Sequence, residues 1–192
     1  MKWLAVIIDS IKNLKGGAIC SAINTFTRNG NPSTNQFVNR ILKECSAPIF
    51  TMIKTWMLEG EINDPHREFF VDTDPSVPDE KLWLYKYSLN PIMVPSFINN
   101  ELAKKILETG KAVNFIRRCC DEQDWMLDES DQMPFDTEEL LAKSSHNDIF
   151  TRLGKYIENA HKVTNMALIK ILFEKFKLLG HCVSIRKYLL MA

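Results

Sequence analysis

The sequence predicts an all-α protein: an elongated helical bundle segment with one long irregular connection and one acidic connector. First, apolar residues recur at three- and four-residue spacing along most of the 192 residues, as on one face of a helix. Second, four prolines between Pro65 and Pro91 interrupt that spacing. Third, the range 121–139 holds nine acidic residues and neither lysine nor arginine. With 45% hydrophobic and 25% charged residues, a chain of this length predicts a globular fold with a sizeable core.

Charge and hydropathy exclude several classes of protein. Lys+Arg and Asp+Glu number 24 each, so no overall positive field indicates nucleic acid or an anionic membrane. The apolar stretch Trp3–Ile8 ends at Asp9 and is shorter than the roughly 7–15 apolar residues of a signal peptide. No apolar run approaches the roughly 20 residues that span a bilayer. We therefore expect an intracellular protein with no membrane segment.

The first two helices are predicted from a face that carries Trp3, Ile7, Ile11 and Leu14 and from a second face around Ile23. Gly16-Gly17 lies between the two faces and is expected to loosen or break the helix there. Asn29–Ser33 is rich in turn-forming residues, and Ser33 or Thr34 is expected to cap the helix that follows.

The next helix shows the clearest pattern. Pro48 suits its first turn, where the missing N–H costs nothing, and Gly60 suits the left-handed residue after its end. Between them lie apolar residues at helix-face spacing: Ile49, Met52, Ile53, Trp56 and Met57. Asn63-Asp64-Pro65 then predicts a turn.

The long connection follows this turn. Glu68–Val71 is predicted to be short and extended or irregular, and we expect Trp83, Tyr85 and Tyr87 to anchor the connection to the core. Another helix is expected to begin at Pro95-Ser96 and to run to about Arg118.

The acidic connector separates these helices from the last ones. It is expected to be solvated and partly disordered, and Asp136 with Glu139 forms a capping box at its end. One or two long helices follow, and the range 150–192 has eight Lys/Arg against two acidic residues. The chain ends inside an apolar helical pattern, which indicates a segment of a longer protein.

Catalytic, metal and cofactor motifs were not found. There is no phosphate-binding or dinucleotide-binding glycine motif, no nucleophile elbow and no His pair with metal-ligand spacing. The five cysteines are scattered, and Cys182 beside His181 is the nearest approach to a zinc pattern. Free thiols, no metal and no cofactor are therefore expected.

The stretch from Pro48 to Val71 resembles the Grip motif of the gamma-tubulin complex components. The resemblance continues through Leu82-Trp83, Val94–Phe97 and Ile106–Lys111, and the final Ile185–Leu190 is similar to the family's entry into its second conserved region. Glu68–Asp72 with Asp74-Pro75 is most like the component 3 branch. The residues that carry the motif are Pro48, Trp56, Gly60, Asp64, Pro65, Glu68, Phe69, Phe70, Val71, Pro95, Phe97 and Gly110. Among them, Pro48, Trp56, Gly60 and Phe69 are expected to shape the fold. The candidate partner contacts are Glu61, Asn63, His66 and Arg67.

The resemblance implies a scaffold that is not an enzyme. Residues 1–120 would be the C-terminal part of an N-terminal Grip domain, 121–136 the connector, and 137–192 the helices that lead into a truncated gamma-tubulin-binding domain. Other components of the complex would pack laterally against the chain, and gamma-tubulin would bind mainly through the missing C-terminal domain. No nucleic acid and no membrane is implied, and the location would be the cytoplasm and cytoskeleton at a centrosome or spindle pole.

Two alternatives remain open from the sequence. In the first, a generic helical module binds an acidic partner or nucleic acid through its basic last helix. In the second, Asp64, His66 and Glu68 perform acid–base catalysis, although closely spaced polar residues after a proline turn more often hydrogen-bond their own loop.

Overall fold

The computed structural model describes residues 2–28, 31–120, 122–127 and 146–190. These ranges are mostly helical, which confirms the predicted all-α class, and they add one small two-stranded sheet. The α-helices are α1 (Lys2–Ile11), α2 (Gly16–Thr25), α3 (Pro32–Glu59), α4 (Asn100–Cys119), α6 (His146–Glu174) and α7 (Leu178–Leu190). The expected capping box at Asp136 and Glu139 and most of the connector lie outside the described residues. No described helix is both long enough and apolar enough to cross a bilayer.

The first helices follow the prediction in part. The break before Gly16 is confirmed, because α1 ends at Ile11 and α2 begins at Gly16. The predicted cap of the next helix is wrong, since Asn31 is the N-cap and its side chain accepts a hydrogen bond from Ser33 N. Pro32 then occupies the first turn, where its missing N–H leaves no bond unmade.

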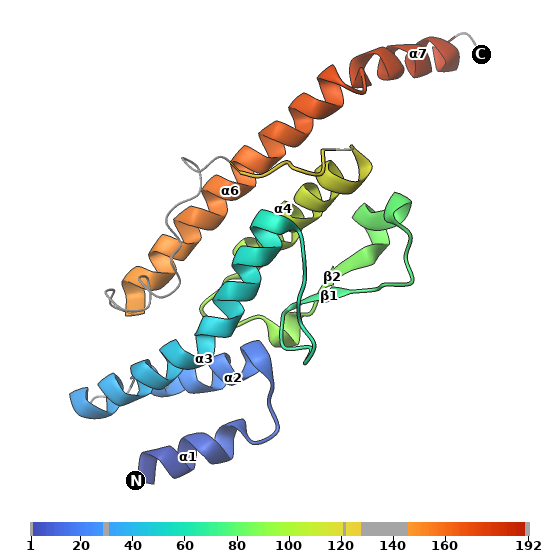
Figure 1. The fold of residues 1–192 in the computed structure, drawn as a ribbon. Helices are drawn as coiled ribbons and strands as arrows, with labels where there is room; N and C mark the ends of the chain where they lie inside the picture. Colours follow the sequence, from blue (N-terminus) through green and yellow to red (C-terminus); the bar gives the residue numbers. More distant parts are fainter. Residues whose placement is uncertain (1, 29–30, 121, 128–145, 191–192) are drawn as a thin grey trace.

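Pro48 does not begin a helix, so that prediction was wrong. It lies inside α3, which is continuous over 28 residues. A proline in a helix interior removes one hydrogen bond and crowds the preceding turn, which kinks the helix. Figure 1 shows α3 changing direction partway along its length, with the first part beside α2 and the second rising beside α4. One helix therefore contacts two different neighbours.

The connection between α3 and α4 contains the sheet. β1 (Val71–Thr73) pairs antiparallel with β2 (Tyr87–Leu89), with Val71 opposite Leu89. Short helical turns complete the connection: η2 (Asp79–Lys81), η3 (Leu82–Lys86) and η4 (Pro91–Met93). The predicted extended piece at Glu68–Val71 is thus confirmed at its end. Val71 is the first residue of β1, and Phe70 lies just before it and accepts a hydrogen bond from Asn90 N. Both side chains are buried.

Anchoring of the connection differs from the prediction. Tyr87 is buried as expected, but Tyr85 is 65% exposed and Trp83 is 40% exposed. Leu82 is the buried residue of η3 instead, and its neighbours Leu84 and Tyr85 are exposed. Trp83 keeps one edge-to-face contact with Phe115 on α4, at 6.3 Å between ring centroids.

The main core joins α1–α4, the connection and the first half of α6. α4 begins later than predicted, at Asn100, because Asn99 caps it by accepting from Leu102 N at 2.7 Å. Buried residues of α6 lie in the same core, namely Ile149, Leu153, Tyr156, Ile157 and Ala160. Every described side chain of α7 is exposed, and Figure 1 shows α7 continuing beyond the end of α6, away from the other helices.

Candidate partner-binding surface

Trp56 is the centre of the packing that supports this surface. Its side chain is fully buried, and its indole Nε1 donates a hydrogen bond to Ile106 O at 2.9 Å. The ring of Tyr87 lies 4.7 Å from the Trp56 ring, centroid to centroid. A buried indole that is both packed and hydrogen-bonded fixes α3, α4 and β2 relative to one another.

The end of α3 is joined to α4 through Gly60. Gly60 has φ 68°, which confirms the predicted left-handed residue at the helix end, and its N–H donates to Trp56 O at 3.0 Å. Asn114 of α4 donates from Nδ2 to Gly60 O. A side chain at position 60 would be strained and would also meet Asn114 Nδ2 at 2.7 Å from its Cβ.

Asp64 organises the loop that follows. Its carboxylate accepts hydrogen bonds from Glu68 N and Phe69 N, each at 2.8 Å from Oδ2. Arg67 has φ 55°, an uncommon left-handed conformation for a residue with a side chain. This turn directs Phe69 and Phe70 into the core, where their ring centroids lie 4.5 Å apart.

The candidate partner contacts all lie on the outside of this loop. Glu61, Asn63, His66 and Arg67 are exposed, and so is Pro65. The hydrogen bonds of Asp64 hold the backbone between them, so the exposed side chains project from a defined turn. Their role as contacts remains a prediction.

Pro95 and Phe97 lie in a different part of the molecule. Pro95 is buried, and Phe97 packs between α3 and α6, with its ring 4.3 Å from that of Phe150 and 5.9 Å from that of Phe50. These aromatic contacts join three segments of the core. The predicted motif residues therefore lie in several places: this aromatic group, the packing around Trp56, the loop that Asp64 organises, and the exposed Pro48 within α3.

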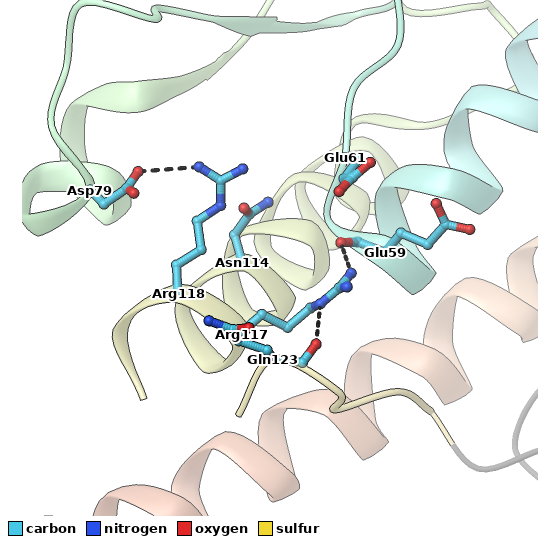
Figure 2. A pocket seen from close by; sticks show the side chains of 7 residues that line it. All are labelled: Glu59, Glu61, Asp79, Asn114, Arg117, Arg118 and Gln123. Atoms are coloured by element: carbon cyan, nitrogen blue, oxygen red, sulfur yellow. Dashed lines mark hydrogen bonds and ion pairs between the residues drawn. The ribbon is translucent and has the colours of Figure 1, made fainter. Parts of the chain in front are cut away.

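A charged pocket lies beside the exposed loop (Figure 2). It has a volume of about 430 Å³ and is lined by Glu59, Glu61, Asp79, Asn114, Arg117, Arg118 and Gln123. Figure 2 shows Glu59 and Glu61 on one side of the pocket and Asp79 with Arg118 on the other. Glu61 thus belongs to both the loop and the pocket.

Hydrogen bonds and ion pairs hold the walls of the pocket together. Arg117 donates from Nε to Gln123 O at 3.0 Å and from Nη1 to Glu59 O at 2.5 Å. Arg118 Nη1 lies 3.4 Å from Asp79 Oδ1. Asp79 also pairs with Lys86, whose hydrogen bond lowers the pKa of that carboxyl below its ordinary value, with a further contribution from Arg118.

The catalytic and metal alternatives gain no support from the geometry. The Asp64 carboxylate accepts hydrogen bonds from backbone N–H groups, and the exposed His66 does not line the pocket described above. Among the described residues, no three His, Cys, Asp or Glu side chains are placed to hold a metal ion. The pocket presents charges and amides suited to polar recognition.

Sequence reasoning did not single out Asp79, Arg117, Arg118 or Gln123 as site residues. The only available signal was the pair of arginines in the last turn of a predicted helix. Arginines are common at that position in any helix, because cations stabilise a helix C-terminus, so the pair does not indicate a site. Nothing in the sequence pattern places that helix end beside Glu59. The pocket exists because Trp56 and Asn114 bring the ends of α3 and α4 together.

Comparison with known proteins shows extended similarity. The family described as "Gamma tubulin complex component N-terminal" matches residues 1–175. Gamma-tubulin complex component 3 of Arabidopsis thaliana is 35% identical over 191 residues, which is all of this chain and 23% of that protein. The human and Drosophila melanogaster proteins of the same name are 34% and 36% identical, again over all of this chain and 21% of theirs. The chain thus spans less than a quarter of the length of these relatives.

Proposed function

The chain belongs to the gamma-tubulin complex component family, and on this premise we propose that it is a non-catalytic scaffold segment of a gamma-tubulin complex subunit. In this proposal it supports lateral assembly of the ring that templates microtubule nucleation. The observation that carries the proposal is the similarity to component 3 proteins along the entire chain. Similarity at a lower level extends to "Spindle pole body component alp6" of Schizosaccharomyces pombe, at 28% identity.

The fold supports a scaffold role. A lateral contact in an assembly needs a surface whose shape is fixed before binding, because ordering a mobile loop on binding costs affinity. The loop Glu61–Arg67 meets this need, since Asp64 fixes its backbone and Trp56 and Gly60 fix the helix end from which it starts. We propose that Glu61, Asn63, His66 and Arg67 contact a neighbouring component.

We also propose a different role for each part of the chain. Residues 1–120 supply the lateral surface, 121–136 connect, and 137–192 lead toward a gamma-tubulin-binding domain. Because the first half of α6 packs in the core formed by residues 1–120, it would fix the orientation of the C-terminal helices relative to the lateral surface. Gamma-tubulin would be held mainly outside these residues, and the complex would reside at a centrosome or spindle pole.

Affinity capture of the full-length parent protein from its own cells tests the main proposal. We expect gamma-tubulin and related family components among the captured proteins, identified by mass spectrometry. Recovery of neither under gentle low-salt conditions would refute the proposal.

The lateral surface needs a sharper experiment. In the full-length parent, Glu61→Ala, His66→Ala and Arg67→Ala are combined and compared with the control Arg40→Ala with Glu44→Ala, two exposed charges on α3. We expect the loop variant to recover less of the neighbouring components and the control to recover as much as the wild type. Equal recovery by both variants would exclude the loop as a lateral contact.

A second candidate function has one observation in its favour. The described side chains of α7 are all exposed, and they combine apolar residues with Arg186 and Lys187. A helical module that binds an acidic partner or nucleic acid would show affinity that falls steeply with salt. Measuring that slope with a single-stranded oligonucleotide and with an acidic peptide tests this function.

A further inference from the structure

The segment 74–78 joins β1 to η2 and presents Ser76 on the surface. Ser76 is exposed, and Figure 1 shows this segment at an outer edge of the molecule. The backbone N–H and the hydroxyl of Ser76 both donate to Asp74 Oδ1, at 2.9 Å and 2.6 Å. No other hydrogen bond joins Ser76 to a described residue. A residue held by two exposed hydrogen bonds belongs to the part of a fold that opens most easily.

Two prolines keep the segment out of helix and sheet. Pro75 and Pro78 lie on either side of Ser76, and neither has a backbone N–H to donate. Pro78 is already extended, with φ −66° and ψ 157°. An enzyme that binds its substrate in an extended conformation therefore has a single turn to open here, the one closed by Val77 N, which donates to Asp74 O at 3.3 Å.

Acidic side chains flank the serine on both sides. Asp72 and Asp74 precede it, Asp79 and Glu80 follow it, and all four are exposed. The range 68–80 contains no lysine or arginine. Like charges brought together across an interface cost several kcal/mol, so such a segment favours an enzyme with a basic substrate groove and excludes one with an acidic groove.

The other described serines and threonines lack this combination. Among the described residues, Ser76 and Thr73 are the hydroxyl residues of these two types that have an acidic residue within four positions on both sides. Thr73 belongs to β1, where it pairs with Tyr87, so its backbone is held in the sheet. Exposure, irregular backbone and acidic neighbours thus coincide at Ser76.

We propose that Ser76 is a phosphorylation site for an acid-directed protein kinase, that is, a kinase whose substrate groove is basic. In the transfer, Ser76 Oγ forms a bond to the γ-phosphorus of ATP while the bond from that phosphorus to the bridging oxygen of ADP breaks. The hydroxyl proton passes to the catalytic base of the kinase, and ADP leaves. The proposal rests on the segment 74–78 alone and does not depend on the proposed function.

The modification would act on the sheet through Asp74. A phosphoserine has no hydroxyl proton to donate and carries about −1.5 to −2 charges at pH 7, so it would repel the Asp74 carboxylate that now accepts from Ser76. Asp74 N donates to Lys86 O at 2.8 Å, which extends the pairing of β1 and β2 by one bond. Phosphorylation should therefore loosen this end of the sheet.

Phosphorylation of the 192-residue chain in vitro tests the site. The probe is the acid-directed kinase casein kinase 2 with ATP and Mg²⁺, and tandem mass spectrometry reads the tryptic peptide 68–81. We expect phosphate on Ser76 and none on Thr73. Ser88→Ala, which removes an exposed serine of β2, is the matched control and should leave the label at Ser76 unchanged. No phosphate on this peptide, or phosphate on Thr73 in place of Ser76, would overturn the proposal.

Charge variants test how the kinase recognises the segment. Asp79→Asn with Glu80→Gln should slow the phosphorylation of Ser76 about tenfold. The variant also removes the ion pairs of Asp79, which would loosen the segment and by itself raise the rate, so a slower reaction reports the lost charges. Glu61→Gln, an exposed carboxylate outside the segment, should leave the rate unchanged. An unchanged or higher rate in the double variant would overturn the acid-directed assignment.

The full-length parent shows whether cells use the site. It is isolated from its own cells after treatment with a phosphatase inhibitor, and the peptide 68–81 is compared with a synthetic reference phosphorylated at Ser76. Detection of the phosphorylated peptide would support the proposal. Detection of the unmodified peptide alone would overturn it.

Amide hydrogen exchange measures the effect on the sheet. The amide of Asp74 should exchange faster in the phosphorylated chain than in Ser76→Ala, which loses the hydroxyl bond without gaining charge. The control is the amide of Asn90, which donates to Phe70 O at the other end of the pairing and should be unaffected. Equal exchange of the Asp74 amide in the phosphorylated and unmodified chains would overturn the proposed effect on the sheet.

Discussion

The indole of Trp56 lies directly on the backbone of Gly110, so closely that a Cβ atom at position 110 would come within 1.9 Å of Trp56 Cε2. Only a residue without a side chain allows this approach. The same indole donates to Ile106 O, one turn earlier on α4. α3 and α4 are therefore held at the distance that places Glu59 beside Arg117 and forms the charged pocket.

Replacing this glycine should destabilise the fold. Gly110→Ala forces the indole or α4 to move, and we expect the free energy of unfolding to fall by at least about 2 kcal/mol. Urea denaturation measures the change. Gly154→Ala is the matched control, because it is also helical and its Cβ would make an ordinary 3.7 Å contact with Leu102 Cδ1. The control should be unchanged or slightly more stable, since alanine favours a helix by up to about 1 kcal/mol over glycine; equal loss in both variants would contradict this account.

Removing the Asp64 carboxylate should open its loop. Asp64→Ala leaves the N–H groups of Glu68 and Phe69 without their acceptor, and hydrogen bonds to a charged group are worth about 2 kcal/mol. Amide hydrogen exchange of Glu68 and Phe69 should become faster in this variant. Asn63→Ala is the control, because its exposed side chain makes no hydrogen bond with a described residue. Unchanged exchange in Asp64→Ala would show that the loop does not depend on the carboxylate.

The sequence alone was sufficient for features set by local chemistry. The end of α3 at Gly60 and the turn after Asn63 both follow from residues a few positions apart, which is why they could be predicted. Pro48 was misassigned because a proline in the sequence is compatible both with the first turn of a helix and with a kink inside one. The apolar spacing on both sides of it shows only that helix is present, and packing against α2 and then α4 decides that the helix continues.

The pocket could not be predicted for a different reason. Its residues come from four separate segments, and the alignment of those segments depends on contacts such as that of Trp56 with Gly110. Trp83 and Tyr85 were expected to be buried because aromatic residues usually are, yet Leu82 takes the buried position of that turn. Which of three adjacent apolar residues faces inward depends on the turn geometry, and the spacing does not reveal it.

The thiols should differ widely in reactivity. Burial raises the pKa of Cys20 to about 12, and its Sγ donates to Cys45 O at 3.5 Å, whereas Cys182 is exposed. Since the thiolate is the reactive form, iodoacetamide at pH 8 should modify Cys182 well before Cys20. Peptide mass spectrometry after timed alkylation measures both rates, and in denaturant the two rates should become similar. Equal rates in the native protein would mean that Cys20 is not enclosed by α2 and α3.

Stability should depend on Asp79 in a pH-dependent way. Its pKa is lowered in the folded chain by Lys86 and then Arg118, so the ion pairs contribute their full stabilisation above the ordinary Asp value of about 3.9 and lose it as the pH falls through the lowered value. Asp79→Asn should therefore be less stable than the wild type near neutral pH, and the difference should shrink below about pH 4. The Asp79 side chain is 47% exposed, so the difference should be small and should decrease with added salt.

Urea unfolding at several pH values measures the difference in stability between Asp79→Asn and the wild type. Asp72→Asn is the control, because the exposed Asp72 carboxylate has no ion pair with a described residue. A difference that stays constant with pH would mean that the charge of Asp79 does not stabilise the wall of the pocket.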